Sequence, residues 1–373
     1  MRESGLLSGI ITILREVRDP RQVNAQHDLA DILFVALACF VCGGKTCVDM
    51  ADFAKSWLRE LREIVDLEFG APSHDTFSRV FRLLDPEELS KAFARCMEAI
   101  GRELGLGGSP GVVAIDGKAL RRGYEAGRAF MPPLMVNVFD AQTRLSLAQA
   151  RAPGGNEIKA GLDLLKAVVL KGCTLTADAL YCRSDVAEAV RAQRAHYALA
   201  LKANQPLLLA EAQAAFARAG DGVQTFETRE AGHGRLERRS GSVAPASWMS
   251  TTYGFPGLAA IGRIETERTT ASGKTTLETR YVALSRRMHP REMLEVVRTH
   301  WTVENQLHWP LDVVFYEDDA RSRKDYAPEN LAVIRRLALN ILRAHPDNTP
   351  VGRKMRRAAL DKDFFFELFA YMR

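Results

Sequence analysis

The chain has 373 residues, of which 47% are hydrophobic and 26% charged, and its formal net charge is only +5. This composition is that of an ordinary globular protein large enough for two or three domains, and the charge is too small to indicate a polyanionic partner by itself. The apolar run Ile32–Cys42 is far shorter than the roughly 20 residues that span a bilayer, and the first 21 residues lack a signal-peptide pattern. We therefore expect no membrane segment.

Six cysteines are present, and Cys39 and Cys42 form a C-x-x-C pair inside an apolar helical run. No second Cys or His pair with zinc-ligand spacing follows. The sequence therefore predicts buried thiols in a reducing cytoplasm rather than a zinc site or a disulfide framework.

Residues 1–108 are predicted to form a helical domain. Ser73 and Asp85 each precede an amphipathic stretch, and Pro86 holds the first helical position after Asp85, as is typical of helix starts. Outward-facing basic side chains would suit DNA binding. The same periodicity fits a domain that only packs against its neighbours, so both interpretations stay open.

Residues 109–205 alternate between strand and helix patterns. The run Val112–Ile115 is apolar and β-branched and leads directly to Asp116, so it predicts a buried central strand. The further predicted elements are strands at 135–140 and 145–150, a helix at 157–169, a strand at 173–177, a helix at 184–193 and a strand at 197–201. This order predicts a mixed α/β sheet, and the absence of G-x-G-x-x-G argues against a dinucleotide fold.

Residues 206–289 are predicted to form a β-rich insertion, with strands at 223–228, 236–243, 260–269 and 276–284. Residues 290–345 are helical by pattern and are expected to complete the core begun by 109–205, and 346–373 are expected to form a basic C-terminal tail helix. Ten Lys or Arg residues lie between 321 and 357 against three acidic ones. Such an excess suits a phosphate backbone, although a solvated helix face is the commoner cause.

Three carboxylates stand in matching contexts. Asp116 and Asp178 each follow a short apolar strand, so parallel pairing of those strands would bring them together. Glu304 is at helical spacing from Val297 and Trp301, which predicts that it lies on an apolar helix face, where a carboxylate is costly unless paired, protonated or metal-bound. Carboxylates are the ligands that Mg²⁺ and Mn²⁺ prefer, and two such ions about 4 Å apart stabilise both oxygens of a phosphoryl displacement. The pattern predicts a two-metal site.

Other interpretations of these residues exist. His300, Glu304 and His308 are spaced four residues apart and could hold zinc, although the H-E-x-x-H signature is absent. The sequence contains neither a G-x-S-x-G nucleophile elbow nor a Walker loop, so neither of the chemistries that these motifs support is indicated.

Each carboxylate also has a purely structural interpretation. Asp178 could cap the turn that precedes Arg183, and Glu304 could pair with Arg298 in the core. The acidic run 317–319 offers rival ligands, but it is predicted to be more exposed.

Seven segments occur in a recognisable order: VVAIDGKALRR (112–122), NEIKA (156–160), LTADALYC (175–182), YALALKANQ (197–205), GHGRLERR (232–239), HWTVENQLHWPLDVVFYEDDARSR (300–323) and ENLAVIRRLALNIL (329–342). Together they resemble the transposases of the H-repeat-associated type of bacterial insertion sequence, within the wider DDE transposase group. The resemblance covers nearly the whole chain, and the 300–323 segment is its most specific part.

This resemblance implies an RNase H-like core with Asp116, Asp178 and Glu304 as catalytic and metal-binding residues. It implies cleavage and strand transfer of DNA with two Mg²⁺ or Mn²⁺ ions, on the terminal inverted repeats of a mobile element and on target DNA. It also implies a homo-oligomer on DNA and a cytoplasmic, nucleoid-associated location in a bacterium. A Tyr, an Arg and a Lys flank the Glu in related groups, whereas this chain has Val297, His300 and Leu311 at those positions.

We expect the DNA contacts to come from basic and polar side chains near the carboxylates. These are Lys118, Arg121, Arg122, Lys202, Asn204, Arg235, Arg298, His300, Asn305, Arg321, Arg323 and Lys324.

The sequence thus favours a metal-dependent DDE transposase. A nuclease of the same fold, and a catalytically silent DNA-binding protein derived from a transposase, remain as alternatives. The presence of Asp116, Asp178 and Glu304 together argues against the silent protein.

Overall fold

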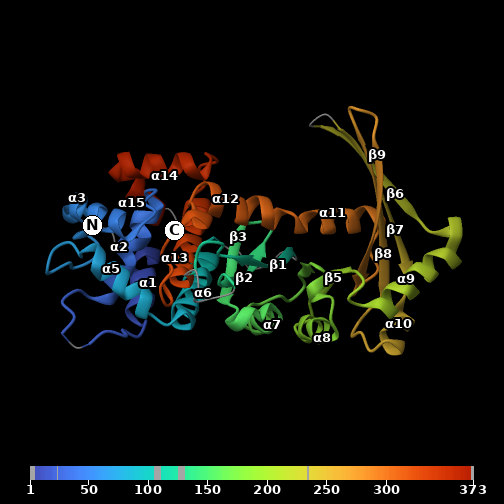
Figure 1. Cartoon of the computed structure of the whole chain (residues 1–373), viewed down its shortest axis with the longest axis horizontal. Helices are drawn as coiled ribbons and strands as arrows, with labels where there is room; N and C mark the ends of the chain where they lie inside the picture. Colours follow the sequence, from blue (N-terminus) through green and yellow to red (C-terminus); the bar gives the residue numbers. More distant parts are fainter. Residues whose placement is uncertain (1–4, 23, 105–110, 125–130, 233–234, 371–373) are drawn as a thin grey trace.

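A single mixed sheet of nine strands, in the order β3-β2-β1-β4-β5-β9-β8-β7-β6, runs through the molecule. The computed structural model describes residues 5–22, 24–104, 111–124, 131–232 and 235–370. The N-terminal helices lie at one end of the elongated molecule, and the long strands β6 to β9 form an arm at the other end (Figure 1). The core strands lie between these two parts.

The core of the sheet has the strand order of an RNase H-like fold, as predicted. β1 (Val112–Ala119) pairs antiparallel with β2 (Leu134–Asp140), which pairs antiparallel with β3 (Leu145–Arg151). On its other side β1 pairs parallel with β4 (Thr174–Ala177), and β4 pairs parallel with β5 (His196–Leu201). Each of these strands coincides with a predicted apolar run.

Helices cover both faces of the core sheet (Figure 1). α7 (Glu157–Ala167) and α8 (Ser184–Ala192) pack on one face, against apolar side chains such as Val113 and Ile115 of β1. α6 (Pro86–Glu103) and α13 (Ala327–Ala344) pack on the other, where Ala114 of β1 belongs to their core. Successive residues of β1 therefore point to opposite layers.

The predicted β-rich insertion continues the core sheet rather than forming a sheet of its own. Its strands are β6 (Thr225–Gly232), β7 (Arg235–Pro245), β8 (Ala260–Thr270) and β9 (Thr275–Leu284). The helix α9 (Pro206–Ala219) precedes β6, and α10 (Ser247–Thr252) lies between β7 and β8. β9 pairs antiparallel with β5, which merges the two parts. α11 (Pro290–His300) lies across this junction, and at Gly241 of β7 a Cβ would come 2.7 Å from Leu294. Glycine thus permits the close approach of helix and strand.

The N-terminal helices share one core with α13. They are α1 (Gly5–Arg15), α2 (Leu29–Val41), α3 (Cys47–Ser56), α4 (Leu58–Leu61) and α5 (His74–Leu83). α2 is buried along its whole length, and the side chains of Ser73 and Asp85 cap α5 and α6 as predicted. These helices therefore pack against the catalytic half, which favours the packing role that the sequence left open.

The C-terminal segment is not a tail, and that prediction was wrong. It forms α14 (Val351–Leu360) and α15 (Lys362–Ala370). The ring of Phe365 lies 5.2 Å from that of Trp57, and the ring of Phe369 lies 5.6 Å from that of Phe34. Because the phenylalanines of α15 face the N-terminal helices, the end of the chain completes the first core.

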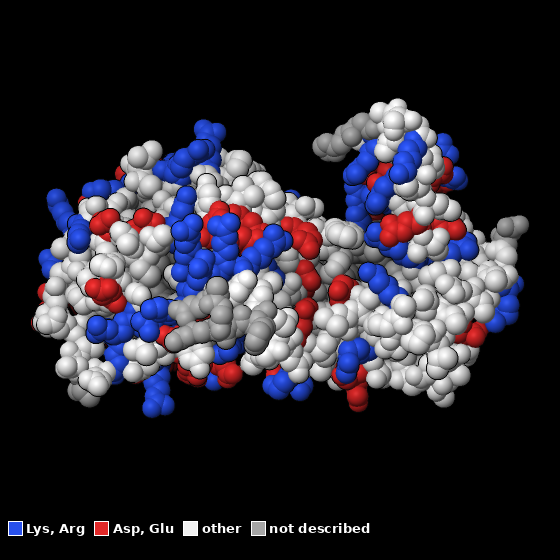
Figure 2. Space-filling view, in the orientation of Figure 1, with Lys and Arg blue, Asp and Glu red and all other residues white. Residues whose placement is uncertain are grey.

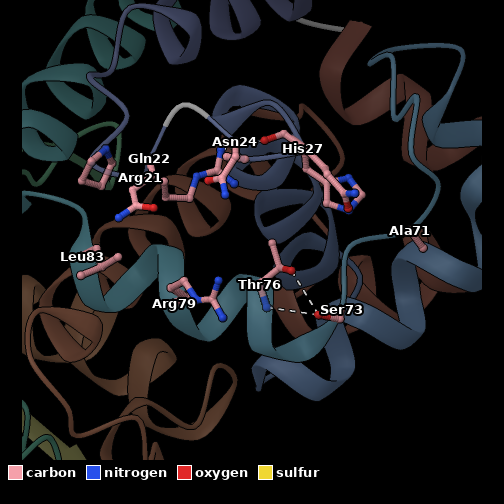
Figure 3. Close-up of a pocket in the computed structure, with 12 residues that line it drawn as sticks. Arg21, Gln22, Asn24, His27, Ala71, Ser73, Thr76, Arg79 and Leu83 are labelled. Carbon is pink, nitrogen blue, oxygen red and sulfur yellow. Dashed lines mark hydrogen bonds between the residues drawn. The ribbon is translucent and has the colours of Figure 1, made fainter.

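A polar hollow of about 790 Å³ lies on the N-terminal helices, between the segment 20–27 and α5 (Figure 3). Ser73 and Thr76 lie at its base, joined by the cap of α5, and Arg79 follows on the same helix. None of the three predicted catalytic carboxylates lines this hollow. Within the described part of the chain, no helix is long and apolar enough to cross a membrane.

Candidate active site

The helix that carries Glu304 is interrupted at that residue. After α11 comes a π-helical turn, η4 (Glu304–His308), followed directly by α12 (Trp309–Val313). Pro310 has no N–H to offer the carbonyl of Gln306 four residues earlier, and the guanidinium of Arg343 from α13 donates to that carbonyl instead. π-helical turns are rare and are found frequently at functional sites.

The predicted burial of Glu304 on an apolar helix face was wrong. Its side chain is 55% exposed, and Trp301, expected on the same buried face, is 51% exposed. The change of helix type at Glu304 breaks the simple periodicity from which that face was inferred. The carboxylate therefore has access to solvent and to a ligand.

Asp116, Glu304 and His308 converge on one point. One donor atom from each lies within 4.8 Å of the other two. Nδ1 of His308 is 3.3 Å from Oε2 of Glu304 and 3.6 Å from Oδ2 of Asp116. Two carboxylates and an imidazole are a donor set that can hold a divalent cation.

Asp116 lies inside β1 rather than at its end, because the strand continues to Ala119. The parallel register that pairs Val112 with Thr174 and Ala114 with Thr176, continued by two residues, sets Asp178 opposite Asp116. β4 ends at Ala177, so its backbone pairing with β1 stops before Asp178.

The electrostatics of Asp116 indicate a site built to attract positive charge. Burial, first, and the negative charges of Glu304, Glu157 and Asp178 together raise the pKa of Asp116 to about 7, although a hydrogen bond from the Gly117 N–H acts in the opposite direction. Four carboxylates thus act on one another in a partly desolvated place. Such an arrangement is costly without a cation.

Asp178 has both a structural and an electrostatic role. Its Oδ1 accepts a hydrogen bond of 2.9 Å from the N–H of Leu180, which caps the short helix η2 (Ala179–Tyr181). This confirms the predicted turn cap. Asp178 is not one of the three residues that converge most closely, but its charge acts on Asp116 and on His300.

Sequence reasoning missed Glu157. Glu157 is the first residue of α7, and a Cβ at Gly117 of β1 would come 2.6 Å from the carboxyl carbon of Glu157. Gly117 therefore lets the carboxylate approach the strand beside Asp116. Burial raises the pKa of Glu157, and the Tyr181 hydroxyl beside it lowers it. The only signal was an acidic residue in the first turn of the helix after the hairpin.

Sequence reasoning considered His308 only as a zinc ligand together with His300. In the structure His308 is 6% exposed and belongs to the group with Asp116 and Glu304, whereas His300 is outside that group. Burial, first, and the positive charges of Lys118 and Arg336 together lower the pKa of His308 to about 3. The imidazole is therefore neutral at pH 7 and can act as a ligand.

Comparisons with known proteins show the family of the chain. A family model described as Transposase DDE domain matches residues 107–341, and one described as DDE_Tnp_1-associated matches residues 11–97. The chain belongs to the transposase DDE domain family.

Two transposase relatives match the chain along almost their whole length. The chain is 30% identical over 370 residues to the "H repeat-associated putative transposase YhhI" of Escherichia coli (strain K12), covering 96% of both chains. It is 31% identical to the "Putative transposase YncI" of Escherichia coli O157:H7, covering 96% of this chain and 93% of that one. A piggyBac transposase synaptic complex with hairpin DNA is similar with a TM-score of 0.42 and 12% identity, covering 99% of this chain and 78% of that one.

Lys118, a predicted DNA contact, is buried and paired with protein carboxylates. Only 7% of its side chain is exposed, and its ammonium lies 2.7 Å from Asp312 and 3.2 Å from Asp318. Both of these aspartates follow Glu304 in the chain. Lys118 therefore ties β1 to the segment after the π-helical turn, and it positions the two halves of the transposase site.

A second buried ion pair lies behind Lys118. Arg336 of α13 is bonded to Glu317 at 2.8 and 3.2 Å and to Oδ1 of Asn137 at 2.8 Å. Asn137 is the partner of Asp116 in the register of β1 and β2. Glu317 is 2% exposed, so the prediction that the acidic run is exposed was wrong at this residue. The ion pair between Arg336 and Glu317 anchors η5 (Glu317–Asp319) to α13.

Several predicted DNA contacts border the carboxylates on the surface. Basic and acidic side chains lie side by side over the region where α11 and α12 meet (Figure 2). Arg121 is 78% exposed and lies 3.4 Å from Asp318, and Arg122 lies 2.9 Å from Asp319. Exposed residues from the same prediction are Lys202, Arg321, Arg323 and Lys324. Their part in DNA binding stays a prediction.

Asn204 is exposed, and its amide nitrogen donates a hydrogen bond of 2.6 Å to the carbonyl of Ala179. That bond fixes the turn that follows Asp178. Asn204 thus has a positioning role in addition to any contact with DNA.

The remaining predicted contacts lie where the arm meets α11. A hollow of about 420 Å³ lies there, with Asn305 next to Glu304 on its rim. Five arginines and one tryptophan line it: Arg235, Arg239, Arg268, Arg280, Arg298 and Trp301. Arg298 pairs with Glu230. His300 is partly buried and its Nδ1 has no hydrogen-bond partner among the described residues.

Proposed function

We propose that this chain is an active DDE transposase that cleaves DNA at the ends of a mobile element and joins them to target DNA. Asp116, Asp178 and Glu304 would hold two divalent cations, Mg²⁺ or Mn²⁺. The observation that carries the proposal is the meeting of Asp116 and Glu304, from a core strand and a distant helix, at a point open to solvent. The family match supports the same chemistry.

The chain's own residues bind and orient the reacting groups. Asp116 and Asp178 offer carboxylate oxygens from neighbouring parallel strands, and Glu304 offers them from the far side of the site. Lys118 and Arg336 hold these elements in place relative to one another through their ion pairs with Asp312 and Glu317. Bound cations would supply charge stabilisation to the attacking and leaving oxygens of a phosphodiester.

The DNA would follow the basic residues on both sides of the carboxylates. Arg121, Arg122, Arg321 and Arg323 lie on the side of α12, and the arginine-lined hollow lies on the side of the arm. Contacts of this kind neutralise phosphates and position DNA without reading bases. We propose that the terminal inverted repeats bind here, to a homo-oligomer of the chain.

The test is cleavage and joining in vitro on DNA that carries the sequences flanking the gene for this chain, with a supercoiled target plasmid and Mg²⁺ or Mn²⁺. We expect cuts at the element ends and end-joined plasmid, and no product in EDTA. Cuts without joined product would instead identify a nuclease. Binding without cuts would identify a silent DNA-binding protein, and neither outcome is compatible with the proposal.

A further inference from the structure

His308 is buried, yet its ring is aimed at the exposed carboxylate of Glu304 and at Asp116. It is 6% exposed, and its ring points Nδ1 between Oδ2 of Asp116 and Oε2 of Glu304. Nε2 is buried and has no hydrogen-bond partner among the described residues.

The distances from Nδ1 of His308 to the two carboxylate oxygens are close to those between neighbouring ligands on one ion, and all three donor atoms lie within 4.8 Å of one another. Ligands about 2.1 Å from an octahedral cation lie about 3 Å from one another. The distances from Nδ1 to the two carboxylate oxygens are 3.3 and 3.6 Å, so small movements would bring all three onto one cation.

The chain also fixes His308 by means that do not involve the carboxylates. The residue ends the π-helical turn and is followed by Trp309 and Pro310. The donation from Arg343 to the carbonyl of Gln306 holds the same turn against α13. The imidazole is thus presented from a rigid element, as expected of a ligand rather than of a mobile surface group.

We propose that His308 is a metal ligand of this site and that its Nδ1 coordinates the same cation as Asp116 and Glu304. This inference rests on the proposed function for the presence of the cation, but it adds a nitrogen ligand to the carboxylates. Imidazole suits transition metals better than Mg²⁺. The site should therefore bind Mn²⁺ more tightly than Mg²⁺, by a margin that depends on His308.

The experiment is pulsed electron paramagnetic resonance on the full chain loaded with Mn²⁺. A directly bound imidazole nitrogen gives ¹⁴N modulation of the Mn²⁺ echo, and protein labelled with [¹⁵N]histidine should show the ¹⁵N pattern instead. We expect this modulation in the wild type, its loss in His308→Gln, and its retention in the matched variant His300→Gln. Mn²⁺ affinity should fall about 10- to 100-fold in His308→Gln, with a smaller loss for Mg²⁺.

The possible outcomes separate this inference from the proposed function. Bound Mn²⁺ without nitrogen modulation in the wild type would overturn the role of His308 while leaving the carboxylate site intact. If the modulation were lost in His300→Gln and kept in His308→Gln, the nitrogen ligand would be His300, and the inference about His308 would be overturned. A chain that binds no Mn²⁺ would overturn both proposals. The isotope-labelled wild type keeps the test valid if His308→Gln does not fold.

Discussion

Replacing Asp116 by Asn should stabilise the metal-free protein at pH 8. The pKa of Asp116 is raised from 3.8 to about 7, a difference of about three pKa units. Each unit corresponds to about 1.4 kcal/mol, so ionised Asp116 opposes folding by at most about 4 kcal/mol. Its side chain is 20% exposed, and solvent screening reduces the expected gain to about 2 kcal/mol.

The gain should depend on pH in a defined way. Below about pH 3 the carboxyl is protonated in both the folded and the unfolded chain, so ionisation of Asp116 no longer separates the stability of the wild type from that of Asp116→Asn. The penalty grows as pH rises from 4 to 7 and is complete above 7, because the raised pKa belongs to the folded state.

Thermal unfolding in EDTA at pH 4.5 and pH 8 measures this difference. The matched control is Asp163→Asn, at an exposed carboxylate 3.1 Å from Lys159 on α7, which should change stability by less than about 1 kcal/mol at either pH. Mn²⁺ should stabilise the wild type and have little effect on Asp116→Asn. If Asp116→Asn is no more stable than the wild type at pH 8, the four carboxylates do not form the repulsive cluster described here.

Glu317→Gln leaves Arg336 buried without its charge partner, and it should lower the free energy of unfolding by about 3–5 kcal/mol in a melting experiment. Glu88→Gln, at a partly exposed side chain of α6 paired with Lys91, should lower it by less than about 1 kcal/mol, and equal losses in the two variants would contradict the buried pair. Phe365→Ala should lower the free energy of unfolding, measured with denaturant, by about 3–5 kcal/mol. Leu360→Ala, at a residue that is 88% exposed, should change it little, and equal effects of the two substitutions would mean that α15 does not pack on the N-terminal helices. Arg321→Ala combined with Arg323→Ala should weaken DNA binding and reduce the slope of log affinity against log salt by about 2, and an unchanged slope would place the DNA elsewhere.

The core strands were predictable because each is a short apolar run bounded by turn residues. β1, β2, β3, β4 and β5 all fall on such runs. The helix caps at Ser73 and Asp85 were predictable for the same local reason. The docking of α15 was not, because nothing local in its sequence distinguishes phenylalanines that pack on α2 from those of a free amphipathic helix.

The site was predictable as a set of carboxylates but not in its details. Asp116 and Asp178 could be paired because parallel strands share a register. The exposure of Glu304 depends on a π-helical turn, which has no periodicity that a sequence pattern reveals. The burial of Lys118 and the approach of Glu157 depend on contacts with residues far along the chain, Asp312 and Gly117 among them.

The most direct test of the account is to measure DNA binding and DNA cleavage side by side for Asp116→Asn, Asp178→Asn and Glu304→Gln. The DNA is again the sequence that flanks the gene for this chain, with Mg²⁺ or Mn²⁺ present. Each variant removes one charge with little change in volume, so we predict that all three bind the DNA with wild-type affinity and that none cleaves it. Cleavage at the wild-type rate by any one of them would contradict the assignment of that residue to the metal-binding site.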